Sequence, residues 1–178
     1  RIRFDFDFYG LVGDAEHINA ELKLSNFYRI DDQLILANFI EGGFIASIKD
    51  VKINDRFFLD GDRMRGFKNL GIGPRDASTS DALGGEIYYI SRNELNFPLG
   101  LPDELGVMGL IFADIGTLYN TASSGSNIND ESTIRSSAGF GITWLSPFGP
   151  VKFYFSKALL KENYDKKEIF RFSFGTTY

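Results

Sequence analysis

Residues 168–178 read Glu-Ile-Phe-Arg-Phe-Ser-Phe-Gly-Thr-Thr-Tyr, and this stretch decides the fold class. Large apolar side chains alternate along it with polar or small ones, so an extended chain points one set to each side. This period of two is typical of a β-strand with one apolar and one wet face. The apolar set is Phe170, Phe172, Phe174 and Tyr178, and the opposite set is Arg171, Ser173, Gly175 and Thr177.

The same alternation recurs through most of the chain. Residues 1–8 carry apolar side chains at the even positions and charged ones at the odd positions. We expect eight strands, at about residues 1–8, 17–25, 33–48, 84–97, 105–119, 134–145, 151–156 and 168–178. Most reach the roughly 9–11 residues that a transmembrane barrel strand needs, whereas globular strands usually have about 5 or 6. The sequence therefore predicts an all-β fold, a transmembrane antiparallel β-barrel with eight strands in this chain.

The connections between these strands alternate in length. Short ones are expected at 31–32, 98–104 and 146–150, and long ones at 49–83, 120–133 and 157–167. Membrane barrels have short turns on one side of the bilayer and longer loops on the other. We therefore expect a long extracellular loop at 49–83 and both chain ends in the periplasm, although the connection at 13–14 is short for its side.

Composition excludes several classes of protein. The 178 residues include no cysteine, which excludes disulfide scaffolds, Cys-ligated zinc and thiol nucleophiles, and the net charge of -5 argues against a nucleic-acid partner. The longest apolar run, from Leu105 to Ala113, is too short for a membrane helix. No Gly-x-Ser-x-Gly motif accompanies the lone His17, and the loop acids Asp60 and Asp62 lack the spacing of a calcium loop. We expect no enzyme, no cofactor and no metal.

A soluble β-sandwich is the alternative explanation of alternating strands, because it buries its apolar faces against a second sheet. Two features favour the barrel instead. Aromatic residues gather near strand ends, as in the girdles of membrane barrels. The opposite face is rich in charge, which suits a wet lumen: it carries Arg1, Arg3, Asp5, Asp7, Glu86, Arg92, Glu94, Lys152 and Arg171.

Residues 56–67, which contain Met64-Arg65-Gly66-Phe67, resemble the sixth extracellular loop of the bacterial surface antigen family of outer-membrane assembly proteins. That family has Val-Arg-Gly-Phe or Val-Arg-Gly-Tyr there, so Met64 departs from the pattern at its first position. Residues 172–178 are similar to the family's terminal β-signal. Further matches follow in the family's order, at residues 72–74, 84–85, 114–117, 137–139 and 144–150.

The resemblance implies a 16-strand barrel preceded by periplasmic POTRA domains. This chain would be a C-terminal β-barrel fragment, 1–178, that supplies half of that barrel and no POTRA domain. Eight strands closing alone would leave an interior just filled by side chains, with the long loop displaced from it. Alternatively the fragment would pair with a second copy as a homodimer, because unpaired strand edges cannot remain in lipid.

The resemblance also implies a site. The family's loop arginine enters the lumen and meets acids of the inner wall, which puts Arg65 against Glu94 and Asp114. Alternation places Asp114 on one face with Phe112, and an acid on the lipid face would be costly. Gly66 permits a tight turn and Phe67 offers an apolar anchor. Without the resemblance, Arg65 would be interpreted as a solvated loop charge.

The function that the resemblance implies is the assembly and insertion of outer-membrane proteins. The terminal aromatic residues would then serve as an insertion signal, or simply face lipid. The expected partners are membrane lipids, client outer-membrane proteins and, through the missing POTRA domains, assembly-machinery lipoproteins. The expected location is the bacterial outer membrane. Two alternatives stay open: a two-partner secretion transporter of the same superfamily, and a small structural barrel without insertase activity.

Overall fold

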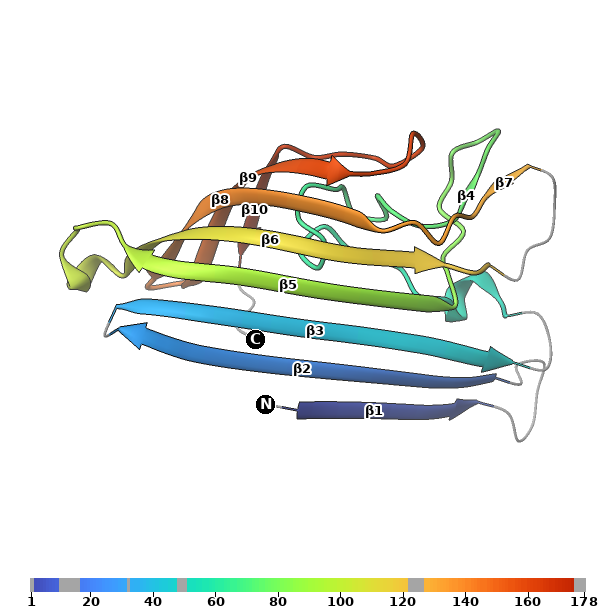
Figure 1. Ribbon diagram of the computed structural model, residues 1–178, viewed down its shortest axis with the longest axis horizontal. Coiled ribbons are helices and arrows are strands. Elements are labelled where there is room, and N and C mark those ends of the chain that lie inside the picture. The colour runs from blue at the N-terminus through green and yellow to red at the C-terminus, as the bar shows by residue number, and fades with distance from the viewer. Residues whose placement is uncertain (1, 10–16, 32, 48–50, 122–126, 175–178) are drawn as a thin grey trace.

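Eight strands of the computed structural model form one antiparallel sheet, in which each strand lies beside the next strand of that sheet along the chain (Figure 1). The structure describes residues 2–9, 17–31, 33–47, 51–121 and 127–174. The strands are β1 (Ile2–Tyr9), β2 (His17–Asp31), β3 (Leu34–Ser47), β5 (Ile87–Pro98), β6 (Val107–Tyr119), β8 (Arg135–Ser146), β9 (Gly149–Leu160) and β10 (Phe170–Phe174).

The loops carry a little regular structure of their own. Strands β4 (Arg75–Asp76) and β7 (Ile128–Asn129) pair with each other, and single 3-10 turns form at η1 (Ile53–Asp55) and η2 (Asp103–Leu105). Within the described ranges, no helix has the length and apolar character needed to cross a membrane.

The predicted all-β antiparallel fold is confirmed, and each expected strand has a counterpart. Two strands are longer than expected. β2 continues six residues beyond 25, through Phe27, Tyr28 and Ile30, because the backbone pairing with β3 persists to Asp31 although the alternation fails. β9 continues to Leu160, where it pairs with the start of β8. The two short strands β4 and β7 are not predicted.

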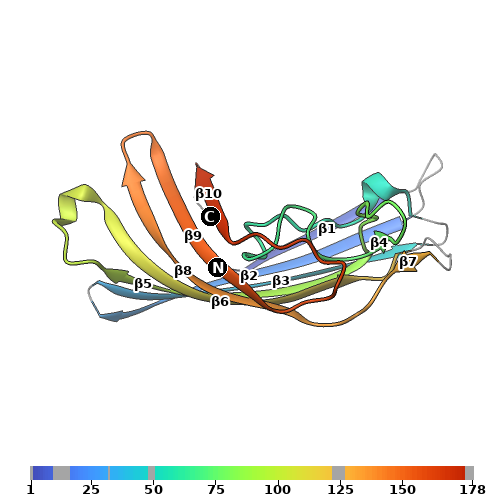
Figure 2. The same cartoon turned by 90° about the horizontal axis from the view of Figure 1, so that it is seen from above.

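The sheet curves into a trough whose two edges are β1 and β10 (Figure 2). The segment between β3 and β5 lies within the concave side of this trough. Of the two alternatives for the fragment, the small closed barrel with a displaced loop is therefore not what the described residues form. The open sheet leaves room that a filled eight-strand interior would not, and the loop occupies it.

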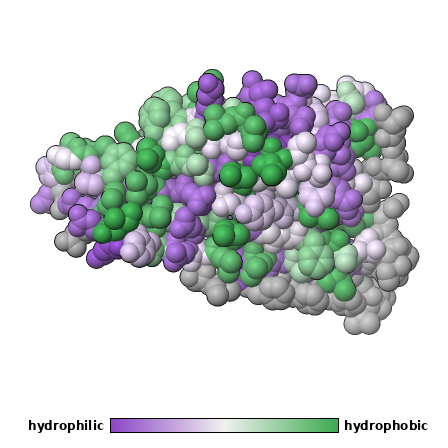
Figure 3. Space-filling model, viewed as in Figure 1, coloured by the Kyte–Doolittle hydropathy of each residue, from purple (hydrophilic) through white to green (hydrophobic). Residues whose placement is uncertain are grey.

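Alternation gives the sheet two different faces. On the convex face the large side chains stay exposed: Ile111 and Ile115 of β6 are 48% and 44% exposed. Aromatic rings continue this face across the last three strands, with Phe155 of β9 5.6 Å from Phe140 and 5.1 Å from Phe170 between ring centroids. Figure 3 shows that hydrophobic patches on this side are interrupted by hydrophilic ones. Polar side chains also pair across neighbouring strands: Nδ2 of Asn38 on β3 donates to Oδ1 of Asn93 on β5 at 2.7 Å.

Long and short connections that follow β2 and the later strands lie at opposite ends of the sheet, as expected from the sequence (Figure 1). The expected short connection at 13–14 lies outside the described residues. The turns between β2 and β3, β5 and β6, and β8 and β9 gather at one end, and the long segments after β3, β6 and β9 gather at the other. This polarity brings the three long segments together above and within the trough, where the site forms.

Candidate functional site

A short turn aims the loop motif at the sheet. The Asp60 carboxylate accepts hydrogen bonds from the backbone N–H groups of Asp62, at 3.0 Å, and Arg63, at 2.7 Å. The N–H of Met64 donates to the Asp60 carbonyl at 3.2 Å, and that of Phe67 to the Met64 carbonyl at 3.3 Å. An aspartate that bonds the backbone two and three residues ahead stabilises such a turn. The motif is therefore held in one compact conformation.

The Arg65 guanidinium binds two carboxylates of the concave face. Its Nε and Nη2 donate to the two oxygens of Asp114, at 2.8 and 2.7 Å, and the backbone N–H of Arg65 adds a third bond at 3.2 Å. Its Nη1 donates to Glu94 at 2.8 Å. Arg65 is 3% exposed and Asp114 0%, so this is a buried, bidentate ion pair of the kind that arginine forms best.

Two aromatic rings complete the surroundings of Arg65. Its guanidinium carbon lies 3.9 Å from the ring centroid of Phe112 and 5.4 Å from that of Tyr154. The two rings meet edge to face, with centroids 5.8 Å apart. Because both rings are buried, the cation–π attraction acts away from solvent.

The partners of Arg65 stabilise the charged form of its guanidinium. Burial alone would lower the pKa of its guanidinium, but the hydrogen bonds and the negative charge of Asp114, aided by Glu94, outweigh burial and raise that pKa above its usual value. The sequence expectation that Arg65 meets Glu94 and Asp114, with Phe112 beside them, thus corresponds to the contacts in the structure.

The other motif residues fix the loop in place. Met64 and Phe67, each 1% exposed, belong to an apolar cluster with Leu59, Ile72, Tyr88, Ile90 and Leu118. Gly66 has φ 93°, and a Cβ placed there would lie 2.9 Å from the Cβ of Ser137 on β8. Glycine is therefore needed at position 66 both for the backbone conformation and for the close approach to the wall.

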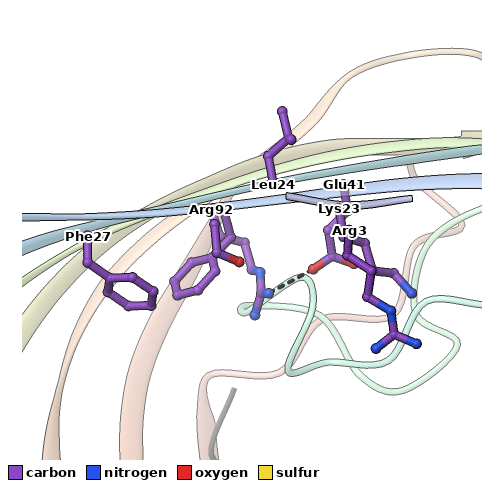
Figure 4. A pocket seen from close by; sticks show the side chains of 8 residues that line it. Arg3, Lys23, Leu24, Phe27, Glu41 and Arg92 are labelled. Atoms are coloured by element: carbon purple, nitrogen blue, oxygen red, sulfur yellow. Dashed lines mark hydrogen bonds and ion pairs between the residues drawn. The ribbon is translucent and has the colours of Figure 1, made fainter. Parts of the chain in front are cut away.

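A second ion network, missed by sequence reasoning, lies beside the first. Glu41 of β3 accepts hydrogen bonds from Arg92 of β5 at 2.8 Å and from Arg63 of the loop at 2.9 and 3.1 Å. Figure 4 shows Arg92 and Glu41 together in a cavity of about 200 Å³ into which Arg3 and Lys23 also project. Alternation along β3 could have assigned Glu41 to the concave face, where Arg92 of β5 was already expected.

A third network anchors the segment between β9 and β10. Arg135 of β8 bonds Asp165 at 3.2 Å and the hydroxyl of Tyr164 at 3.0 Å, and both charged side chains are fully buried. Its Nη1 also donates to the carbonyls of Glu131 and Thr133. Nothing in the local pattern near Arg135 signals this contact, because its acid lies 30 residues further along the chain.

The remaining sequence candidates are dispersed. Phe170, Phe172 and Phe174 lie exposed on the convex face, at 48%, 54% and 56%, and Tyr178 lies outside the described residues. His17 is buried at the start of β2. Among the residues that the structure describes, no group of three or more His, Cys, Asp or Glu side chains could hold a metal ion.

Fold and site together define a class: antiparallel β-sheet proteins in which a long loop folds onto the concave face of the sheet and is anchored there by an arginine. The comparisons with known proteins agree with that class. The sequence model described as the Omp85 superfamily domain matches residues 1–178, and the chain belongs to this superfamily. It is a family of outer-membrane proteins that are not enzymes.

Two relatives of the chain are outer membrane protein assembly factors BamA. The chain is 37% identical over 174 residues to that of Neorickettsia risticii (strain Illinois), a match covering 96% of this chain and 23% of the relative. With that of Neisseria meningitidis serogroup B (strain MC58) it shares 30% identity over 167 residues, covering 78% of this chain and 20% of the relative. The chain thus spans between a fifth and a quarter of these relatives.

A solved structure shows the same fold. The crystal structure of BamA from Haemophilus ducreyi lacking POTRA domains 1–3 superimposes with a TM-score of 0.78 at 23% identity. The match covers 89% of this chain and 35% of that structure.

Proposed function

We propose that this chain is the C-terminal half of a 16-strand outer-membrane barrel that folds other outer-membrane proteins into the bilayer. The named relatives are assembly factors, and the 37% match spans 96% of this chain. The observation that carries the proposal is the anchoring of Arg65 to Asp114 and Glu94. It holds the motif loop, the segment between β3 and β5 that contains Met64 to Phe67, against the concave face of the sheet.

The open edges of the sheet support a larger parent barrel. β1 and β10 each have a strand neighbour on one side only. Unpaired backbone groups are too costly to leave in lipid, so further strands must cover both edges in a membrane. Eight more strands would do so and widen the lumen enough to hold the loop. Pairing of two copies through these edges is the other way to satisfy them.

The proposed mechanism involves no bond chemistry. A client strand adds to an exposed edge of the sheet, which supplies backbone hydrogen bonds while the client enters lipid. The terminal strand, with Phe170, Phe172, Phe174 and Tyr178, is the proposed edge, and the loops after β3, β6 and β9 would face the outside. The proposed partners are lipids, client proteins and, through upstream POTRA domains, assembly lipoproteins.

The motif loop would keep the wall in shape while that edge opens. Arg65 ties the loop to β5 and β6 in the middle of the sheet, and the apolar cluster around Met64 and Phe67 seals it. A fixed wall beside a movable edge is what a templating barrel requires.

The test is an Arg65→Ala substitution in the full-length protein, in cells that depend on it. We expect the levels of folded outer-membrane proteins to fall, with Lys68→Ala as the control, because Lys68 is an exposed cation three residues away in the same loop. Unchanged client levels and viability would refute the proposed role. Loss of one exported polypeptide, with outer-membrane proteins intact, would instead identify a secretion transporter.

A further inference from the structure

The motif loop also contacts the last strand, β10, through Arg171. The sequence pattern identifies this residue only as a charge of the lumen face. Arg171 of β10 points to the concave side, where its Nη1 donates to the side-chain oxygen of Asn69 at 3.0 Å and its Nη2 to the backbone carbonyl of Phe67 at 3.4 Å. The same guanidinium lies 2.5 Å from Glu168 and 3.9 Å from Asp62. One side chain thus joins β10 to the loop on both sides of the motif.

Backbone hydrogen bonds extend this contact. The N–H of Glu168 donates to the Gly66 carbonyl at 3.0 Å, and the N–H of Lys68 to the Lys166 carbonyl at 2.9 Å. The N–H of Lys166 donates in turn to the carbonyl of Gly71 at 2.8 Å. Residues 166–168, directly before β10, are therefore joined to the motif loop by a short series of backbone hydrogen bonds.

The loop leaves space for Arg171 at one position. A Cβ at Gly61 would lie 1.8 Å from Nη2 of Arg171 and 2.6 Å from the carbonyl oxygen of Phe67. The N–H of Gly61 also donates to the same Asn69 oxygen that accepts from Arg171, at 2.9 Å. Gly61 thus lines one side of the space that holds the Arg171 guanidinium. A side chain at position 61 would have to displace that guanidinium.

β10 lies at an edge of the sheet. Over its described residues, Phe170 to Phe174, it pairs with β9 and with no second strand, so its contacts to the motif loop add to a single ladder of backbone hydrogen bonds. The Arg171 side chain is only 13% exposed, so its bonds are shielded from the solvent that weakens surface ion pairs.

We propose that Arg171 is a positioning residue that fastens the last strand to the motif loop, so that the loop determines how β10 lies at the edge of the sheet. Two ties then act in series: Arg65 fixes the loop to β5 and β6, and Arg171 fixes β10 to the loop. Release of the second tie frees the edge strand while the wall remains intact. The consequence for client assembly rests on the proposed function; the tie itself does not.

Hydrogen exchange in the full-length protein, reconstituted in lipid nanodiscs, tests the tie. In Arg171→Ala we expect backbone amides of residues 168–174 to exchange about tenfold faster, the effect of losing about one net hydrogen bond's free energy, while β6 is unchanged. Gly61→Ala should reproduce this rise with the arginine still present. Arg171→Lys should restore only part of the protection, because an ammonium cannot span the acceptors that the planar guanidinium reaches.

Lys157→Ala is the matched control, since it removes an exposed cation from the neighbouring strand β9. No rise in β10, or an equal rise in β6 and β10, would overturn the proposal. Client assembly measured in the same variants separates the two proposals. Exchange that rises in β10 while Arg65→Ala leaves clients unaffected supports the tie and rejects the assembly function.

Discussion

Arg65 and Asp114 are 49 residues apart in sequence, yet three hydrogen bonds of 2.7 to 3.2 Å join them. Neither side chain is more than 3% exposed. A buried ion pair is favourable only while both charges are present and bonded, because each alone is costly to hold away from water. The position of the loop and the charge pattern of β6 are therefore interdependent.

Arg65→Ala should lower the free energy of unfolding by about 3 to 5 kcal/mol, the usual cost of leaving one charge of a buried pair unpaired. Thermal unfolding in detergent measures the change. Asp114→Asn in the same protein should cost less in the Arg65→Ala background than alone, because the two residues act as a unit. Additive losses, or a loss no larger than that of Lys68→Ala, would contradict the coupling.

Gly66→Ala should destabilise the loop for two separable reasons. The backbone φ of 93° is unfavourable for alanine, and the new methyl would meet Ser137 at 2.9 Å. We expect a loss of about 1 to 3 kcal/mol, as for other residues held in sparsely populated conformations. Adding Ser137→Gly should recover the steric part alone. Full recovery would show that the backbone conformation is not a constraint.

Glu41→Gln should lower the free energy of unfolding, because it removes the ion pairs of Glu41 with Arg63 and with Arg92. Glu41 is 8% exposed and binds both Arg63 and Arg92, so its neutral replacement leaves two arginines without their carboxylate. A loss of a few kcal/mol is expected, in the range measured for broken buried pairs. Glu162→Gln, in the loop after β9, is the control with equal charge change. If both variants unfold alike, the network contributes nothing.

Alternation predicted the sheet because it depends on neighbouring residues only. Each strand of the sheet displays its own two faces, so residues 168–174 and 107–119 could be assigned without knowledge of their partners. It failed for Phe27 and Tyr28, where large rings occupy both faces and pairing with β3 alone maintains the strand. The open edges are equally invisible to a local pattern, because alternation within one strand does not show which strands lie beside it.

The contacts of the site also fall into those that the sequence predicts and those that it does not. The pairing of Arg65 with Glu94 and Asp114 was predicted from a family motif together with strand parity. Arg135 with Asp165, and Arg171 with Asn69, join residues 30 and 102 positions apart and belong to no motif recognised in the sequence. A solvated charge and a buried one look identical in sequence, so only the path of the loops distinguishes them.

A charge placed on the convex face should cost most at mid-strand if this face meets lipid. Ala113 lies at the centre of β6 and Val107 at its first residue, and both share the outward parity of Ile111 and Ile115. Ala113→Arg should therefore cost about 2 to 4 kcal/mol of folding free energy in vesicles, and Val107→Arg about 0 to 1, as arginine does at the midplane and near the interface of membrane barrels. Denaturant titration of the full-length protein in lipid measures both. In water-exposed sheets no such dependence on depth exists, so equal and small effects at the two positions would mean that β6 does not face the bilayer.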